Sequence, residues 1–492
     1  MNKLKIKSFI LAYWPIGLII LVSFSLRLYH LGYHDFWYDE AYTVNFAKFL
    51  RISWNPPLYN TLIHFWTKLF GFSETSLRFP SFLFSFFSVI TVFFLGRELF
   101  GKKVGLLASV FIGLSPFHIW YAQEARDYGM MLFFGTLSSY LLFRALNKNT
   151  NKLWFFFALS SLATMLTNYF GLILFLAQCI YVICIVKRRL IFKELFFLLC
   201  VILAFSLYSP LFLSKFYYLM GGFWVPKPTL ASLVITVENF ILGYTGSLYL
   251  YLASNILVAV AIIFLQFNFK KVSFAQLFFC IFLLVFPVIL IFSFSKILFS
   301  IYLDRGLMLF SPYLYLILSL GIMQLKKKWL YSYVFLLVLL MGIADYRYYQ
   351  DQLFSPIYHH IGSYVKKPIR EVAVYLDKNV GAGDLIYYTN ESVCPLLTYY
   401  MKTRHQFFRI IDPAYVDTNW NRVYKEGYGN ILYYKMAEVS FDSLWVIFTN
   451  WSRNGELELF SMSIKKWLEG SFRMISSKDF GGLLICRFEK IK

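Results

Sequence analysis

Two adjacent carboxylates near the N-terminus are the first residues whose types and spacing suggest chemistry. Asp39 and Glu40 lie in residues 34–42 (HDFWYDEAY). A partly buried carboxylate beside a like charge has a raised pKa and can serve as a general base. Adjacent residues point about 100° apart on a helix, so the two should not share one task. The structural alternative is that Asp39 caps a short helix and Glu40 complements its dipole.

Two arginines form the second group. Arg126 lies in residues 115–128 (SPFHIWYAQEARDY), and Arg305 follows Asp304 at the start of a late apolar stretch. The planar guanidinium fork is suited to binding a phosphate. The alternative is a simple ion pair, of Arg126 with Glu124 or Asp127, or of Arg305 with Asp304. Both interpretations stay open at this point.

A polar residue on an amphipathic stretch forms a third candidate. Residues 55–59 (NPPLY) start a helix in the ordinary way, with Asn as N-cap and Pro at the first helical position. The apolar face that follows predicts a helix lying along the membrane plane. His64 on this helix is interpreted as a polar residue at headgroup level in preference to a metal ligand.

The composition shows what must position these residues. Of 492 residues, 59% are apolar and only 15% are charged, against about 25% charged in an average chain. Mean hydropathy is +0.60, so a disordered chain and a purely soluble enzyme are excluded. Stretches long enough to cross a bilayer are predicted at 8–29, 79–96, 104–121, 128–146, 153–167, 170–186, 195–213, 248–267, 274–294, 301–323 and 329–345.

Charge placement predicts the orientation of these eleven stretches. With a cytoplasmic N-terminus, the cytoplasmic segments carry 18 basic and two acidic residues, whereas the outer ones up to residue 349 carry 11 and nine. This is a strong positive-inside pattern, and an odd number of spans places the C-terminus outside. The basic balance is therefore a signal of topology and does not indicate a nucleic-acid partner.

The segment from residue 350 onward has a different character. Its near-neutral charge and alternating patterns predict a small α/β domain. Helices are expected at 369–379, 395–401 and 457–468, and strands at 385–388, 406–411, 444–448, 472–476 and 482–488. The predicted fold is thus a polytopic α-helical membrane protein with about 11 transmembrane helices in residues 1–349, and an accessory α/β domain, residues 350–492, on the outer side.

Several of these strings occur together in one family of membrane enzymes. The sequence resembles the polytopic glycosyltransferases of the GT-C fold that use polyprenyl-phosphate sugars. It is most similar to the bacterial branch of glycosyltransferase family 39, related to protein O-mannosyltransferases and lipid A aminoarabinose transferases. The resemblance rests on residues 37–42 (WYDEAY), 55–59 (NPPLY), 77–81 (LRFPS), 115–118 (SPFH), 121–128 (YAQEARDY) and 168–171 (NYFG).

The resemblance implies an inverting sugar transfer at the outer membrane surface, with the catalytic motif in the outer loop 30–78. Asp39, paired with Glu40, corresponds to the family's proposed base, and Arg126 and Arg305 correspond to arginines that bind the donor phosphate. Further substrate-binding candidates are Arg78, Glu124, Asp127, His64, Asn168 and Tyr169. The family often has histidine where this chain has Asn55 and Asn168, so a metal or acceptor role of those histidines is not carried over.

The implied partners are a polyprenyl-phosphate sugar, membrane lipids of the cell membrane, and an acceptor that is a glycan, a lipid or a protein. No cofactor is assigned, and a divalent metal stays open without assigned ligands. The competing interpretation is a lipid or glycolipid transporter without transferase chemistry. A transporter is expected to have ionisable residues at mid-membrane depth and related halves. Here nine of the eleven acidic residues before residue 350 fall on the outer side, and no internal repeat is visible.

The charge pattern predicts that the C-terminus lies outside the cytoplasm. A reporter that is active only in the cytoplasm, fused after Lys492, should be silent, while the same reporter fused into the 187–193 loop should be active. Full activity of the Lys492 fusion would overturn the orientation.

Overall fold

The computed structural model describes residues 3–50, 55–185, 191–221, 225–266, 273–353, 367–390, 393–403, 405, 407–409, 441–449 and 459–491. The chain forms two compact units. The first contains residues 1–32 and 46–364, and the second contains residues 33–45 and 365–492. The predicted boundary at 349/350 lies near residues 354–366, which are outside the described residues, so that boundary stays a prediction.

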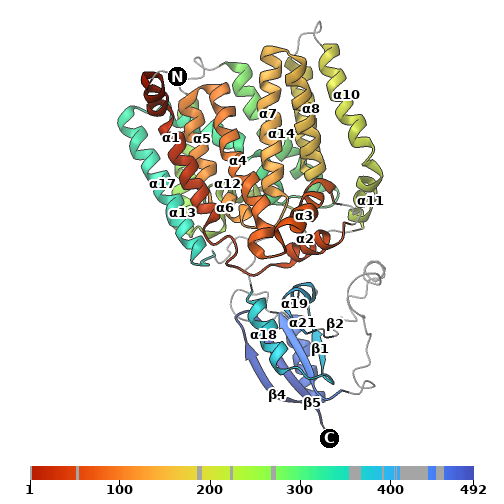
Figure 1. The fold of residues 1–492 in the computed structure, drawn as a ribbon. Helices are drawn as coiled ribbons and strands as arrows, with labels where there is room; N and C mark the ends of the chain where they lie inside the picture. The colour runs from red at the N-terminus through yellow and green to blue at the C-terminus, as the bar shows by residue number, and fades with distance from the viewer. Residues whose placement is uncertain are drawn as a thin grey trace. The chain divides into compact units, whose positions relative to one another are not determined.

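The first unit is helical (Figure 1). Its elements are α1 (Lys3–Leu28), α3 (Pro57–Phe70), α4 (Glu74–Phe100), α5 (Lys102–Leu114), α6 (Pro116–Ala122), α7 (Tyr128–Lys148), α8 (Asn151–Thr167), α9 (Phe170–Ile185), α10 (Ile191–Ser206), α11 (Ser209–Met220), α12 (Leu230–Leu242), η2 (Gly243–Thr245), α13 (Leu248–Gln266), α14 (Phe274–Ile297), α15 (Asp304–Leu307), η4 (Met308–Phe310), α16 (Ser311–Ile322) and α17 (Lys327–Tyr349). Helix α2 (Tyr38–Lys48) starts in the second unit and ends in the first.

The predicted apolar stretches all lie on helices or on bent helix pairs. Among the described residues, six helices are long and apolar enough to cross a membrane: α4, α7, α13, α14, α15–α16 taken together, and α17. Two further pairs pass the same test but are bent, α5–α6 by 60° and α10–α11 by 68°. The polytopic helical fold is confirmed, while the count of eleven spans stays a prediction.

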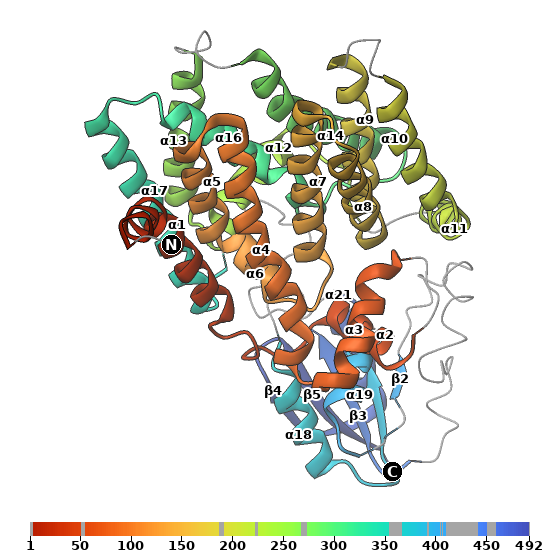
Figure 2. The same cartoon turned by 45° about the horizontal axis from the view of Figure 1, so that its top comes forward.

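Helices α4, α5, α7 and α8 lie side by side, as both views of the structure show (Figure 2). Where α4 meets α5, a Cβ added to Gly96 would lie only 2.7 Å from the Cα of Gly105. Small residues at such a crossing let two backbones approach closely, which is how helices gain van der Waals contact in lipid. The turn that joins these two helices contains Gly101 at φ +92°, a conformation that glycine adopts without strain.

The break between α5 and α6 depends on a buried arginine. Pro116 has no N–H, so the carbonyl of Ile112 has no helical partner at that position. Arg27, fully buried on α1, donates from Nη2 to that carbonyl and from Nη1 to the carbonyl of Gly113, both at 2.7 Å. Its guanidinium also donates to the hydroxyls of Ser23 (2.6 Å) and Ser85 (3.1 Å). Arg27 thus replaces hydrogen bonds that the broken helix lacks.

The second unit contains a five-stranded sheet in the order β2-β1-β3-β5-β4. The strands are β1 (Leu385–Tyr388), β2 (Phe407–Arg409), β3 (Leu444–Thr449), β4 (Phe472–Asp479) and β5 (Leu483–Lys490), and the helices of this unit are α18 (Ile369–Asn379), α19 (Cys394–Tyr400) and α21 (Leu459–Ser471). Strand β1 pairs in parallel with β2 and β3, whereas β5 pairs antiparallel with β3 and β4. The predicted small α/β domain is confirmed, and each described element overlaps its predicted range.

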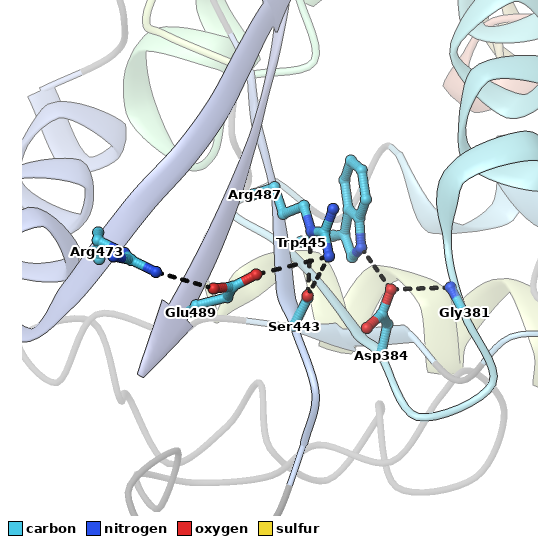
Figure 3. Close-up of polar contacts among 7 residues, drawn as sticks. All are labelled: Gly381, Asp384, Ser443, Trp445, Arg473, Arg487 and Glu489. Atoms are coloured by element: carbon cyan, nitrogen blue, oxygen red, sulfur yellow. Dashed lines mark hydrogen bonds and ion pairs between the residues drawn. The ribbon is translucent and has the colours of Figure 1, made fainter. Parts of the chain in front are cut away.

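The central strand β3 is buried along its whole length, which explains its continuous apolar run LWVIFT. Polar contacts hold its start (Figure 3). The indole of Trp445 donates to Asp384 at 2.9 Å, and the same carboxylate oxygen accepts the N–H of Gly381, which closes the turn before β1. On β5, Arg487 donates to the hydroxyl of Ser443, and Glu489 makes an ion pair with Arg487 and another with Arg473.

Replacing Arg27 with Met should destabilise the first unit, because the carbonyls of Ile112 and Gly113 would then be buried without these donors. The expected loss is on the order of 3 kcal/mol, measured as a lower melting temperature of the purified protein in detergent. Arg144→Met is the matched control, since Arg144 donates to Tyr140 one turn away on its own helix. Equal melting temperatures for the two variants would contradict this role of Arg27.

Candidate active site

The two predicted catalytic carboxylates have different environments on α2. The carbonyl of Trp37 accepts the first helical hydrogen bond, from Ala41, so Trp37 is the N-cap residue. Glu40 is buried, and its Oε2 accepts the N–H of Trp37 at 3.3 Å, which is one half of a capping box. Asp39 is only partly buried, at the second helical position. The expectation that Asp39 caps this helix is therefore wrong: Glu40 does so, because the helix begins two residues earlier than that expectation required.

The turn between α6 and α7 holds Arg126 by its backbone. The N–H of Arg126 donates to the carbonyl of Glu124 at 2.7 Å, and its carbonyl accepts the hydroxyl of Ser81, on α4, at 2.8 Å. Glu124 is fully buried and accepts the indole N–H of Trp120 at 2.6 Å. The Arg126 backbone is therefore fixed between two helices, and its side chain is partly exposed.

Asp127 and Asn168 come together from distant positions in the chain. The Asn168 side-chain amide donates to Asp127 at 2.9 Å, and its oxygen accepts the N–H of Phe170 at 3.1 Å. Burial raises the pKa of the Asp127 carboxyl, while the positive charge of Arg126, the bond from Asn168 and the charge of Arg305 oppose that rise. This contact links the turn before α7 to the turn between α8 and α9.

The two predicted phosphate-binding arginines converge on one aromatic ring. The guanidinium carbons of Arg126 and Arg305 each lie 5.9 Å from the ring centroid of Tyr128. Each cation is attracted by the ring electrons at such a distance. The structure therefore places two cations, from distant positions in the sequence, near the ring of the first residue of α7.

Helix α15, which carries Arg305, is fixed by its neighbours. Asp304 accepts hydrogen bonds from Thr236 and Asn239 of α12, both at 2.6 Å. Gly306 packs against Phe170, because a Cβ at Gly306 would lie 2.3 Å from the Phe170 ring. Asp304 thus connects α15 to α12.

Lys215 is a basic residue of this region that the sequence analysis did not single out. It lies on α11, close enough to Arg126 for the like charges to interact, and its Nζ is 5.9 Å from the ring centroid of Tyr218. The available signal was a single lysine just beyond the predicted span 195–213. It is weak on its own, because such a lysine ordinarily reaches for the membrane surface.

Three other candidates make contacts that hold the chain in place. Arg78 is buried and donates to the carbonyl of Leu31 at 3.1 Å. His64 Nδ1 lies 2.8 Å from the carbonyl oxygen of Ala47. Tyr169 lies 3.5 Å, hydroxyl to hydroxyl, from Tyr208, which donates to the carbonyl of Asn55 at 2.6 Å. In the part of the chain that the structure describes, no group of three or more His, Cys, Asp or Glu side chains is arranged to hold a metal.

Comparison with known proteins gives a family match over part of the chain and a shared fold. Residues 55–213 match the family model of dolichyl-phosphate-mannose-protein mannosyltransferases. An uncharacterised protein of Aquifex aeolicus is 29% identical over 174 residues, which are 32% of this chain and 35% of that protein. The match therefore spans about a third of the relative's length.

Solved structures share the fold over nearly the whole chain. ArnT from Cupriavidus metallidurans, in the apo state, superposes with a TM-score of 0.61 at 12% identity, over 97% of this chain and 98% of that one. The same protein has been solved with undecaprenyl phosphate bound (TM-score 0.59, 11% identity, 96% of this chain and 98% of that one covered). The archaeal oligosaccharyltransferase AglB from Archaeoglobus fulgidus, in complex with an inhibitory peptide and a dolichol-phosphate, gives 0.52 at 11% identity over 96% and 80%.

The predicted resemblance is confirmed at the level of class. The chain has the GT-C fold of these solved structures, and its residues 55–213 match the family model. Its helices are those of a multi-span membrane protein.

The contact between Gly306 and Phe170 generates a prediction. Gly306→Ala should force the Phe170 ring away from α15 and destabilise the first unit by about 1–3 kcal/mol, as overpacking does. Gly342→Ala is the control, because nothing lies within 4 Å of a Cβ there and alanine favours the helix. Melting curves in detergent should show a loss for the first variant alone, and equal curves would contradict the packing described.

Proposed function

We propose that this protein is a membrane glycosyltransferase that moves a sugar from a polyprenyl-phosphate donor to an acceptor hydroxyl at the outer face of the membrane, with inversion. One observation carries the proposal. The guanidinium carbons of Arg126 and Arg305 each lie 5.9 Å from the Tyr128 ring centroid, in a chain with the fold of ArnT, which has been solved with undecaprenyl phosphate bound. Two guanidiniums at one place suit a phosphate that gains charge as it leaves.

Asp39 is the proposed general base. In the transfer step, the acceptor oxygen attacks the anomeric carbon and gives its proton to the Asp39 carboxylate. The bond from the anomeric carbon to the phosphate oxygen breaks, and polyprenyl phosphate departs with the bonding electrons. Attack opposite to the leaving phosphate inverts the anomeric configuration.

The environments on α2 support Asp39 in preference to Glu40. The Glu40 carboxylate is buried and holds the N–H of Trp37, so we assign Glu40 to positioning the start of α2. The Asp39 side chain is partly exposed one residue before it. A base must reach the hydroxyl that it deprotonates, and exposure is therefore a requirement for this role.

The charge pattern supports the outer-face location. An enzyme on that side lacks nucleotide sugars, so the activated sugar must arrive on a lipid. We propose a multi-pass protein of the cell membrane with a cytoplasmic N-terminus and an outer C-terminus, supported by the 18-to-2 bias of its cytoplasmic segments. The acceptor is a glycan, a lipid or a protein, and we propose that the remaining candidates Arg78, Glu124, Asp127, His64, Asn168 and Tyr169 shape the substrate site through the contacts within the chain described above.

Asp39→Asn should lower sugar transfer by at least about 100-fold, because the neutral amide cannot accept the proton. Stability should change by less than about 1 kcal/mol, the usual size of a charge effect in a first helical turn.

Arg126→Lys keeps the charge but loses the bidentate fork, so it should raise the KM for the donor. Transfer from purified polyprenyl-phosphate sugar, measured beside a melting curve for each variant, tests both.

Glu40→Gln and Arg144→Lys are the matched controls for these variants. Glu40→Gln should lower stability more than Asp39→Asn does, yet keep measurable transfer when folded. Arg144→Lys should leave the KM for the donor unchanged. Near-normal transfer by Asp39→Asn would move the base elsewhere and contradict the mechanism.

A further inference from the structure

The segment that carries Asp39 is anchored on the C-terminal part of the chain. Residues 33–45 form one compact unit with residues 365–492, although more than 300 positions separate them in the sequence. The contacts that join them lie a few residues before Asp39, and neither the family resemblance nor the sequence pattern indicated them.

The first anchor is an ion pair that also caps a helix. Asp35 Oδ1 lies 3.2 Å from Arg370 Nη2, and Asp35 Oδ2 accepts the backbone N–H of Arg370 at 2.8 Å. Arg370 is at the second position of α18, whose N-cap residue, Pro368, makes no side-chain cap bond. Asp35 therefore supplies the carboxylate that a helix start favours, and its side chain is only 11% exposed.

The second anchor is aromatic and lies beside the first. Phe36 is buried at 2% exposure, its N–H donates to the hydroxyl of Tyr400 at 2.8 Å, and its ring meets the Tyr399 ring edge-on at 5.0 Å. The guanidinium of Arg370 lies 5.5 Å from the ring centroid of Tyr400. Arg370 thus holds Asp35, and Tyr400 holds Phe36, the next residue of the segment.

We infer that Arg370 and Tyr400 of the C-terminal domain are positioning residues for transfer, because they hold Asp35 and Phe36 and thereby orient the start of α2 and the Asp39 carboxylate. This inference rests on the proposed role of Asp39 as base. Phe36 is followed directly by Trp37, the N-cap of α2, so little flexible chain separates the anchor from the base. Proton transfer depends on placing the base within hydrogen-bond reach of the acceptor, and a displacement of 1 Å can reduce a rate by about 100-fold.

The test is a comparison of two arginines of the same domain in the full-length protein. Arg370→Ala should lower kcat by about tenfold, with the KM for polyprenyl-phosphate sugar within twofold of wild type, because the donor-binding residues are untouched. Arg370→Lys keeps a cation over Tyr400 and should recover most of the rate. Arg473→Ala is the matched control, since it removes an exposed ion pair with Glu489 and no contact with residues 33–45.

A double variant separates positioning from a general loss of structure. If Arg370 acts through Asp39, adding Arg370→Ala to Asp39→Asn should leave the residual transfer of Asp39→Asn unchanged, whereas a general loss should multiply the two effects. Where Arg370→Ala does not fold, Arg370→Gln is measured instead, because its uncharged side chain fills more of the space of arginine and its amide N–H can still donate to Asp35.

Each outcome bears on one of the two proposals. Equal kcat for Arg370→Ala and Arg473→Ala, a change in the donor KM alone, or multiplied effects in the double variant would overturn the positioning role. In those cases a strongly impaired Asp39→Asn still upholds the base. Near-normal transfer by Asp39→Asn overturns the proposed base itself, whatever the Arg370 variants do.

Discussion

The membrane part of this protein depends on the hydrogen bonds that Arg27 donates to the end of α5. A helix broken inside a bilayer exposes carbonyls that neither water nor lipid can satisfy. The proline at 116 creates that problem, and the buried guanidinium on α1 solves it by donating to Ile112 and Gly113. Because the break is satisfied in this way, α6 can bend by 60° from α5 and bring residues 123–128 to the start of α7.

That bend determines which residues meet. The turn after α6 holds the backbone of Arg126 against Ser81, while α15 is held by its bonds to α12. The guanidiniums of Arg126 and Arg305 then both lie within 6 Å of the ring centroid of Tyr128, at 5.9 Å each. Cations at one site repel one another, and a concentration of positive charge of this kind is stabilised when an anion binds there. The positive charge of Lys215, close to Arg126, adds to the same field.

Much of the fold could be predicted from the sequence. A helix that crosses a bilayer needs about 20 mostly apolar residues, and strands and helices alternate clearly in the C-terminal domain. The ranges expected for helix 369–379 and strand 385–388 are those of α18 and β1. The shared site of Arg126 and Arg305 was implied only by the family resemblance, because the residues by themselves do not show how α15 packs against distant helices. The cap of α2 was assigned to Asp39 as the structural alternative, and the helix start at Tyr38 gives it to Glu40 instead. The anchor of Asp35 on Arg370 escaped prediction because long-range ion pairs leave no periodic signal.

The most direct test of the central claim is the stereochemistry of the product. Purified wild-type protein, reconstituted in lipid vesicles, is incubated with a polyprenyl-phosphate sugar labelled with 13C at the anomeric carbon and with acceptors from the cell envelope, and the anomeric configuration of the product is determined by NMR. A single displacement by an acceptor hydroxyl, with Asp39 as base and the phosphate held by Arg126 and Arg305, predicts a product of inverted configuration together with released polyprenyl phosphate. A product of retained configuration, or labelled lipid that crosses the membrane without any transfer, would contradict the account.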